Sequence, residues 1–287
     1  MKHTVKQHAF DPKEVEVLGG VIKNLREFAI TGCHLNDQII KMFLSGFKNL
    51  VSLNFERCQG YTGTTFLNIC MLAKQMKTLR LGGSENFYNT EITADGLDKF
   101  RAYPNIQLEH VALNYCSKVG SKGIQTIADC FSQSLLSFEM VRNCFDKSPQ
   151  LDYAELKPLE KCRKMKKIMI GYSRNIDDKL VEILAKWPSL ESICFPECTL
   201  QTDFSSLRNY CPTLSLVDLS GDSWVKYETI NSLKQLPNLE ILHLGRHGVT
   251  QDTSNMEIMN VAVWSSTKTL KECFLWTSSP RQGTSPD

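Results

Sequence analysis

Apolar residues recur along the chain in a nine-residue pattern that the sequence repeats ten times. Positions one, four and six of this pattern are apolar, and position nine is most often cysteine or another small polar residue. The stretches LVSLNFERC at 50–58 and LESICFPEC at 190–198 follow it 140 residues apart. The ten copies begin at Leu25, Leu50, Met76, Leu108, Leu135, Met165, Leu190, Leu214, Leu239 and Leu270. Their spacing of 24 to 32 residues predicts stacked repeat units, none of which can bury its apolar face alone.

Each copy of the pattern predicts a short β-strand. Positions four and six are two residues apart, so their side chains point to the same face of a strand and enter a shared core. Position nine comes after the chain has bent away, where a small residue that hydrogen-bonds to nearby backbone fits. Position nine holds Cys33, Cys58, Cys116 and Cys198, then Ser84, Asn143, Ser173 and Ser278, with Asp222 and His247 as departures. Stacked copies therefore predict one parallel sheet.

The segments between the strands have the apolar spacing of helices. The clearest examples are residues 65–75, 92–104, 123–131 and 176–188. Thr93 or Asp95 is expected to cap the helix in 92–104. Proline stands two residues before three of the copies, at Pro188, Pro212 and Pro237, where it ends a helix. Strands lie ~4.8 Å apart and packed helices ~8–10 Å apart, which predicts an arc with the sheet on its concave face and helices on its convex face.

An N-terminal capping half-repeat is expected over residues 1–24. Asp11 is placed to cap a helix, with Pro12 in its first turn. Gly19 and Gly20 are expected to close that helix. The half-repeat would cover the open end of the first full repeat.

The repeat domain itself is expected over residues 25–278. Residues 279–287, SPRQGTSPD, have no apolar periodicity and are expected to form a disordered tail. Whether the Ser-Pro pairs of this tail are modified is not determined by the sequence.

The repeats resemble the cysteine-containing subclass of leucine-rich repeats. The motif NYCPTL at 209–214 is similar to the end of that repeat, and ITADGL at 92–97 is similar to its helix start with one inserted alanine. The resemblance covers roughly residues 11–278. It implies an α/β fold, a ribonuclease-inhibitor-like right-handed arc of about ten repeats. In this family such repeats are typical of the substrate-binding domains of F-box proteins, the recognition subunits of cullin-type ubiquitin ligases.

The F-box itself is not present, because only 24 residues precede the first expected strand, too few for its three helices. A fragment of a longer form, a family member without the F-box and a scaffold with the same solenoid are all consistent with this.

Composition and charge exclude some classes of protein. With 42% hydrophobic and 22% charged residues the chain is typical of globular proteins. A formal net charge of +2 gives no overall attraction to nucleic acid or anionic membrane. No apolar run reaches the ~20 residues of a membrane-spanning helix. The N-terminus has neither a secretory signal nor the arginines of a mitochondrial presequence, so a cytoplasmic or nuclear location is expected. The 11 cysteines are expected to be reduced, buried thiols.

Residues that could hold a metal or perform chemistry have simpler structural interpretations. Cys194 and Cys198 lie up to ~13 Å apart in an extended stretch, too far to share one zinc ion. His243 and His247 meet the same objection. Cys33 and Cys58 fall within disulfide range, although reduced thiols are the expected state.

No nucleophile elbow, P-loop or dinucleotide motif is present, and LGGSEN at 81–86 is expected to be a turn. The sequence therefore predicts no enzyme activity, no cofactor and no metal.

A protein partner is expected on the concave face, which positions three, five, seven and eight of each copy should form. Large aromatic and basic side chains at such positions are typical of interface hot spots. The candidate partner-binding residues are Arg57, Arg80, His110, Tyr115, Arg142, Tyr172, His243, Arg246 and Trp276. Met169, Leu216 and Ile241 add isolated apolar side chains. Phe274 and Trp276 have a second interpretation, in which they close the core at the last strand.

The run KCRKMKK at 161–167 concentrates five positive charges before the sixth copy. It is either a solvated helix end and turn or a rim for an acidic partner.

These features predict a non-catalytic protein–protein interaction module, specifically a substrate receptor or adaptor of the F-box type. Cullin-type ubiquitin ligase components are then candidate partners, and a monomer is expected. The alternatives are an F-box-independent scaffold or assembly factor and a GTPase regulator, although a regulator would have more uniform repeats of about 28 residues and an acidic tail. Nucleic acid is not an expected ligand, because the inner face alternates in sign. The identity of the partner is not encoded in the pattern.

Overall fold

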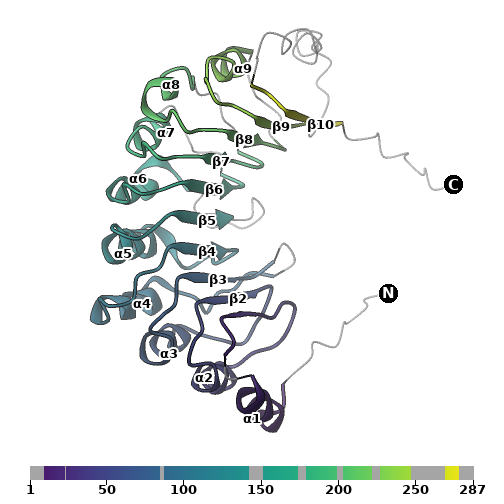
Figure 1. Cartoon of the computed structure of the whole chain (residues 1–287), viewed down its shortest axis with the longest axis vertical. Coiled ribbons are helices and arrows are strands. Elements are labelled where there is room, and N and C mark those ends of the chain that lie inside the picture. Colours follow the sequence, from purple (N-terminus) through teal and green to yellow (C-terminus); the bar gives the residue numbers. More distant parts are fainter. Residues whose placement is uncertain are drawn as a thin grey trace, which may run out of the picture.

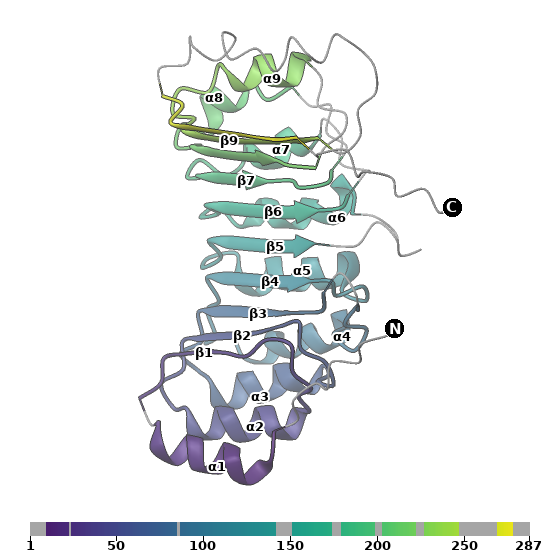
Figure 2. The ribbon, with the colours of Figure 1, turned by 90° about the vertical axis from the view of Figure 1, so that its right-hand side faces the viewer.

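The computed structural model describes residues 10–22, 24–84, 87–141, 151–173, 179–198, 203–221, 227–246 and 269–277. These residues form an arc with a parallel sheet along its concave side and helices along its convex side (Figure 1). Turned by 90°, the sheet faces the viewer and the helices lie behind it (Figure 2). This is the arrangement that the repeat pattern predicts. The tail at 279–287 lies outside the described residues.

The sheet contains ten described strands, which follow one another in chain order. They are β1 (Glu27–Ala29), β2 (Ser52–Glu56), β3 (Thr78–Gly82), β4 (His110–Asn114), β5 (Ser137–Val141), β6 (Lys167–Gly171), β7 (Ser192–Cys194), β8 (Leu216–Leu219), β9 (Ile241–Arg246) and β10 (Glu272–Thr277). Every strand begins at position three of its copy. Neighbours pair in one register, so that Leu53 lies beside Leu79 and Leu79 beside Val111.

Helical segments return the chain from strand to strand between β1 and β9. The described α-helices are α1 (Pro12–Val21), α2 (Asp37–Gly46), α3 (Thr64–Leu72), α4 (Ala94–Leu97), α5 (Gly120–Phe131), α6 (Tyr153–Leu156), α7 (Leu180–Leu184), α8 (Leu207–Tyr210) and α9 (Tyr227–Leu233). Two 3₁₀-helices, η1 (Asp98–Ala102) and η2 (Lys157–Lys161), continue α4 and α6. Thr93 caps α4 as expected, because its hydroxyl accepts a hydrogen bond from the Gly96 amide at 3.2 Å.

The core lies between the sheet and the helices and is built from positions one, four and six. In the second to eighth copies every one of these side chains is at most 1% exposed. Each such burial contributes ~1.5–3 kcal/mol before the entropy of ordering the chain is subtracted. Trp187 packs at the end of its helical segment, fully buried, and its indole Nε1 donates to the Leu159 carbonyl at 3.2 Å.

The first copy is only partly buried, because one of its sides has no preceding repeat. Aromatic rings close this end of the core. The Phe28 ring lies 4.6 Å from that of Phe43, 5.0 Å from that of Phe47 and 6.0 Å from that of Phe55, measured between centroids. Phe10, just before α1, adds an edge-on contact with Phe43 at 5.5 Å.

Position nine hydrogen-bonds to nearby backbone, as the pattern predicts, and in two described copies it joins a repeat to the preceding one. The Cys58 thiol donates to the Ile30 carbonyl of the preceding repeat at 3.3 Å. The Cys198 thiol does the same to Ile170 at 3.2 Å. Ser173 donates instead to Gly171 of its own repeat at 3.4 Å. In these three copies the small donor at position nine therefore supplies a hydrogen bond to a backbone carbonyl near the end of a strand.

The glycines of α1 do not end the helix, and the expectation that they do is wrong. Asp11 and Pro12 begin α1 as predicted, with a complete capping box, but the helix continues through Gly19 and Gly20 to Val21. Gly19 instead lies against Gly46 of α2. A Cβ added at Gly46 would stand 2.7 Å from the Gly19 Cα. The absence of both side chains lets the two helices approach closely.

Residues 81–84 of the LGGSEN segment are described and lead out of β3, whereas residues 85 and 86 of the expected turn lie outside the described residues. Gly82 ends β3 with φ of 156°, and a Cβ there would overlap the Asn114 carbonyl oxygen. Beyond it, Ser84 and Phe87 pair through two backbone hydrogen bonds of 2.7 and 3.1 Å. Glycine is required here because the neighbouring strand passes too close for any side chain.

Gly46→Ala is predicted to lower the free energy of unfolding by ~1–3 kcal/mol, because the new methyl group forces α1 away from α2. Gly20→Ala is the matched control. Its Cβ would meet no atom within 4 Å, so the better helix propensity of alanine should raise stability by ~0.5–1 kcal/mol. Urea unfolding followed by circular dichroism measures both. Equal effects of the two substitutions would contradict the close helix contact.

Candidate functional site

Position-five residues form a row across the sheet through all ten described strands. Because neighbouring strands share one register, these residues stand side by side. In order they are Ala29, Asn54, Arg80, Ala112, Glu139, Met169, Cys194, Asp218, His243 and Phe274. The row divides into a polar part over β2–β5 and a more apolar part over β6–β9.

Arg80 is the centre of a polar network in the first part. Its Nε donates to Glu56 Oε2 at 2.9 Å, and its Nη2 lies 2.8 Å from Glu139 Oε2. Glu139 is two strands away, or ~9.6 Å. The side chain between them is Ala112, which is small and almost fully buried, so the guanidinium passes over it. A long side chain at position 112 would block this contact.

Two further residues complete the network. Asn114 Nδ2 donates to Glu56 Oε1 at 2.7 Å, and its Oδ1 accepts from the Val141 amide at 2.9 Å. Lys167 Nζ lies 3.1 Å from Glu139 Oε1. Charged groups over β2–β6 are therefore already paired with one another.

The pKa values of this network follow from the pairing. Burial would raise the pKa of Glu139, whose side chain is only 7% exposed, but hydrogen bonds and charges from Arg80 and Lys167 bring its pKa below the usual value. Burial likewise opposes the charge of Arg80, and the carboxylates of Glu139 and Glu56 outweigh it, which raises the Arg80 pKa. Both groups are charged at neutral pH.

Glu56 and Glu139 occupy positions seven and five of their copies, which are expected on the inner face, but the pattern within one repeat does not show that they neutralise Arg80. The sequence signal that could have revealed this pairing is Ala112, a small residue between Arg80 and Glu139 at position five of three consecutive copies.

Over β6–β9, positions three and five of the strands include partly exposed apolar side chains. Met169 on β6 lies beside Cys194 on β7, both at position five. Leu216 on β8 lies beside Ile241 on β9, both at position three. His243 Nδ1 is 3.4 Å from Asp218 Oδ2.

Position eight adopts a left-handed backbone conformation in several copies, which the spacing of apolar residues does not indicate. Arg57, Tyr115, Tyr172 and Glu197 have φ values of 62°, 56°, 54° and 57°. This left-handed conformation costs most residues ~1–2 kcal/mol. It turns the chain where the strands end, since these residues follow the ends of β2, β4, β6 and β7. Glycine fills the same position at Gly32 and Gly221, with φ of 73° and 80°.

The predicted partner-binding residues therefore occupy different surroundings. Arg80 is enclosed in the network, His110 is exposed at the start of β4, and His243 stands beside Asp218. Arg57, Tyr115 and Tyr172 lie along the edge where the strands end, and the Tyr115 ring is 6.4 Å from that of Tyr88. Arg142 and the side chains of Arg246 and Trp276 lie outside the described residues. A role for any of these residues in binding stays a prediction.

The thiols of the described residues are free, and burial suppresses their chemistry. Burial raises the pKa of Cys58 to about 11 and those of Cys70, Cys162 and Cys211 to about 12. Such thiols are protonated and unreactive at neutral pH. Within the described part of the chain, no three His, Cys, Asp or Glu residues gather as a metal site would need. The described helices are all too short or too polar to cross a membrane.

The basic run at 161–167 is largely paired with its surroundings. Lys161 contacts Asp129 at 2.5 Å, and Lys166 contacts Glu191 at 2.7 Å. Arg163 donates to the Lys186 carbonyl at 3.2 Å, and Lys167 belongs to the inner network. These pairings favour the interpretation of a solvated turn over that of a free basic rim.

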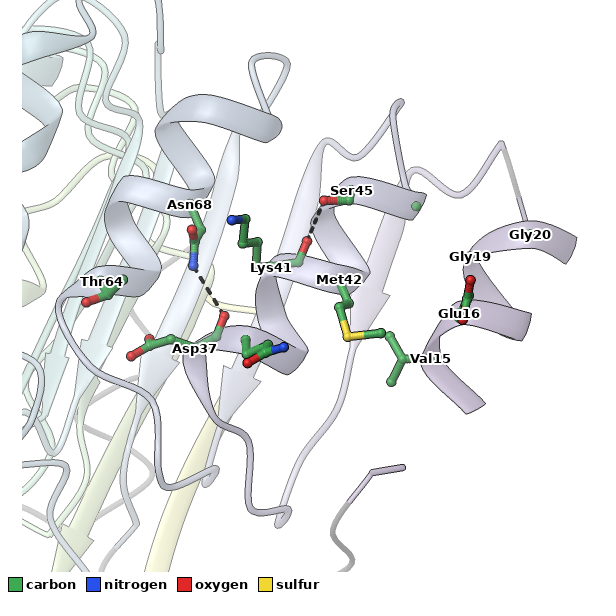
Figure 3. Close-up of a pocket in the computed structure, with 12 residues that line it drawn as sticks. Val15, Glu16, Gly19, Gly20, Asp37, Lys41, Met42, Ser45, Thr64 and Asn68 are labelled. Atoms are coloured by element: carbon green, nitrogen blue, oxygen red, sulfur yellow. Dashed lines mark hydrogen bonds between the residues drawn. The ribbon is translucent and has the colours of Figure 1, made fainter. Parts of the chain in front are cut away.

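A hollow of about 960 Å³ lies between α1, α2 and α3 on the convex side. Figure 3 shows Val15 of α1 and Met42 of α2 facing each other across it. Its polar groups bind one another, since Asn68 Nδ2 donates to the Asp37 carbonyl at 3.2 Å and Ser45 Oγ to the Lys41 carbonyl at 2.8 Å (Figure 3). The charged residues that line the hollow, Glu16, Asp37 and Lys41, are of mixed sign and define no single kind of ligand, so the concave face is the better candidate.

Comparison with known proteins identifies the fold. No protein-family model matches the chain, and no curated protein matches its sequence. A chain of the yeast Rad7–Elc1 complex aligns with a TM-score of 0.64 and 16% sequence identity, over 80% of this chain and 60% of its own. The fold is a leucine-rich repeat solenoid.

Internalin C2 from Listeria monocytogenes aligns over 87% of this chain and 80% of its own, with 15% identity. Its TM-score of 0.43 is too low to carry an argument. The likeness to the Rad7–Elc1 chain concerns the fold alone, and this protein spans about 60% of that chain's length.

Glu139→Gln is predicted to lower the free energy of unfolding at pH 7 by ~1–3 kcal/mol, because it removes the charge that holds Arg80 and Lys167. The folded-state pKa of Glu139 is lowered from 4.5, so its stabilising effect is present above pH 4.5 and is lost as the pH falls through the folded pKa. The variant should lose less stability than the wild type on acidification below pH 4.5. Unfolding curves measured from pH 7 to pH 3 test this.

Glu109→Gln is the control, since Glu109 forms an exposed ion pair with Lys77 at 3.0 Å. Its effect should stay within ~0.5 kcal/mol. If the two variants behave alike, the buried network does not contribute as described.

Arg57→Gly is predicted to raise the free energy of unfolding by ~0.5–1 kcal/mol, because glycine adopts positive φ without the penalty. The reciprocal change, Gly32→Ala, should lower it by ~1 kcal/mol. A Cβ at Gly32 meets no atom within 4 Å, so only the backbone conformation is tested. Thermal melts of both variants would refute the left-handed assignment if the signs were reversed.

Proposed function

We propose that this protein is a non-catalytic recognition module that binds a protein partner on its concave face. The observation that carries the proposal is the uninterrupted parallel sheet along that face. Its core needs only positions one, four and six of each repeat. The side chains at positions three and five are therefore available for another molecule, and they combine charged, polar and apolar groups, as protein interfaces do.

Two further observations support a protein as the ligand. The charges on the face alternate in sign across neighbouring strands, from Glu56 to Arg80 and from Glu139 to Lys167, so no basic stripe is available for a phosphate backbone. The similar solved chain comes from a complex of two proteins, Rad7 and Elc1.

Within this class we infer a substrate receptor or adaptor of the F-box type, acting in the cytoplasm or nucleus. The cysteine at position nine supports the inference, because its thiol makes the inter-repeat hydrogen bond in the copies that end at Cys58 and Cys198. Copurification of the chain with a cullin adaptor tests it. A stoichiometric partner whose amount does not change on proteasome inhibition would indicate a scaffold instead.

Arginine substitutions on the two faces test whether the concave side binds. The inner variant combines Thr78→Arg, His110→Arg and Ser192→Arg, all at position three. The outer control combines Met71→Arg, Ala154→Arg and Tyr210→Arg, which are exposed on α3, α6 and α8. In affinity purification with quantitative mass spectrometry, the amount of each partner recovered should fall at least tenfold with the inner variant. It should stay unchanged with the outer variant. The opposite pattern would exclude the concave face.

A further inference from the structure

An apolar stripe crosses the concave face obliquely from β6 to β9. Met169 and Cys194 are neighbours in position five, and Leu216 and Ile241 are neighbours in position three of the next two strands. Met169, Leu216 and Ile241 are partly exposed, and Cys194 forms the floor between them. The equivalent positions on β2 and β3 carry only polar side chains. The core does not require these apolar groups, since their side chains point away from it.

The dimensions of the stripe match a short helix. Three strand spacings along the arc and two residues along the strand place Met169 and Ile241 ~16 Å apart. Three turns of α-helix are ~16 Å long, or about 11 residues. A helix with apolar residues at i, i+3 or i+4, i+7, and i+10 or i+11 presents a stripe of about this length on one side.

Backbone hydrogen bonding favours a helix over an extended peptide. Strands β6 to β9 each pair with a neighbour on both sides, so their amides and carbonyls are already used. An extended segment lying on this face would bury its own backbone groups without partners, each at a cost of ~1–3 kcal/mol. A helix hydrogen-bonds its own backbone amides and carbonyls, so binding leaves none of these groups buried without a partner.

Charges lie at both ends of the stripe. Asp218 lies two residues beyond Leu216 on β8, and the exposed Glu272 pairs in register with Ile241. Lys167 lies two residues before Met169 at the other end, and its side chain is 41% exposed. Because Lys167 is already paired with Glu139, the charge that a ligand would meet lies over β8–β10, and a complementary segment has a basic residue there.

We propose that the stripe Met169–Cys194–Leu216–Ile241 binds an amphipathic α-helix of a protein partner, about three turns long, with a basic residue at the end over Asp218 and Glu272. The proposal rests on the concave-face function above and assigns that face's apolar half to one kind of ligand. The polar network around Arg80 then lies outside the helix-binding region, because its groups are satisfied by one another.

A peptide selection on the 287-residue chain tests the proposal. Random 16-residue peptides displayed on phage are selected on the immobilised wild-type protein, and the recovered peptides are synthesised as probes. We expect peptides with apolar residues at helical spacing and a lysine or arginine at one end. Their affinity should fall at least tenfold for Leu216→Glu and change less than twofold for Thr78→Glu, a control at the same strand position on β3. Circular dichroism should show helix formation on binding.

Charge exchange provides an independent readout. Glu272→Lys should weaken the same peptides several-fold, and replacing the terminal lysine of the peptide with glutamate should restore binding to that variant. Leu216→Ser replaces Leu216→Glu if the latter melts at a lower temperature, since it keeps the face uncharged and still removes the apolar contact.

Each remaining outcome overturns the inference in a distinguishable way. Peptides that depend on Thr78 and not on Leu216 would leave the concave-face function intact and exclude the stripe. Peptides weakened only by Met71→Glu on the convex side would contradict both. Recovered peptides with alternating or proline-rich patterns, or a selection without any Leu216-dependent binder, would exclude a helix as the ligand.

Discussion

Constant register between neighbouring strands is the constraint on which the rest of this structure depends. Every described strand begins at position three of its repeat and pairs with the next at equivalent residues. This stacks positions one, four and six into one continuous core and aligns position five into one row. Helices packed on the other side need about twice the spacing of the strands, so the stack must bend toward the sheet. Curvature and the concave surface therefore follow from the same pairing.

The ends of the strands show how local chemistry supports that register. Position eight turns the chain where the strands end, in a left-handed conformation that glycine adopts freely and Arg57, Tyr115 and Tyr172 adopt at a cost. At position nine a thiol or hydroxyl then donates a hydrogen bond to a backbone carbonyl, as Cys58 does to Ile30. The thiols act as buried hydrogen-bond donors whose raised pKa values keep them protonated. Cysteine is used here for its size and weak polarity and not for redox chemistry.

The concave face is not one uniform binding surface. Over β2–β6, Arg80, Glu56 and Glu139 neutralise one another around the small Ala112. A partner that covered this network would remove its water and receive few new hydrogen bonds in return. Over β6–β9 the apolar side chains of Met169, Leu216 and Ile241 are partly exposed instead. Burial of such groups is favourable without any loss of polar pairing, so binding energy should come mainly from the second region.

The sequence by itself determined the period, the strand positions, the core ladder and the role of position nine, because each depends on spacing along one repeat. Only the tertiary structure decided what lies between repeats. Gly19 was expected to end a helix and instead lets α1 approach Gly46. Arg80 resembled a free hot-spot residue until the register placed Glu139 two strands away across an alanine. The positive φ of position eight, as at Arg57 and Tyr115, is a backbone conformation that the spacing of apolar residues does not predict. Contacts between residues 25 to 60 positions apart depend on how repeats stack, and a pattern within one repeat cannot express them.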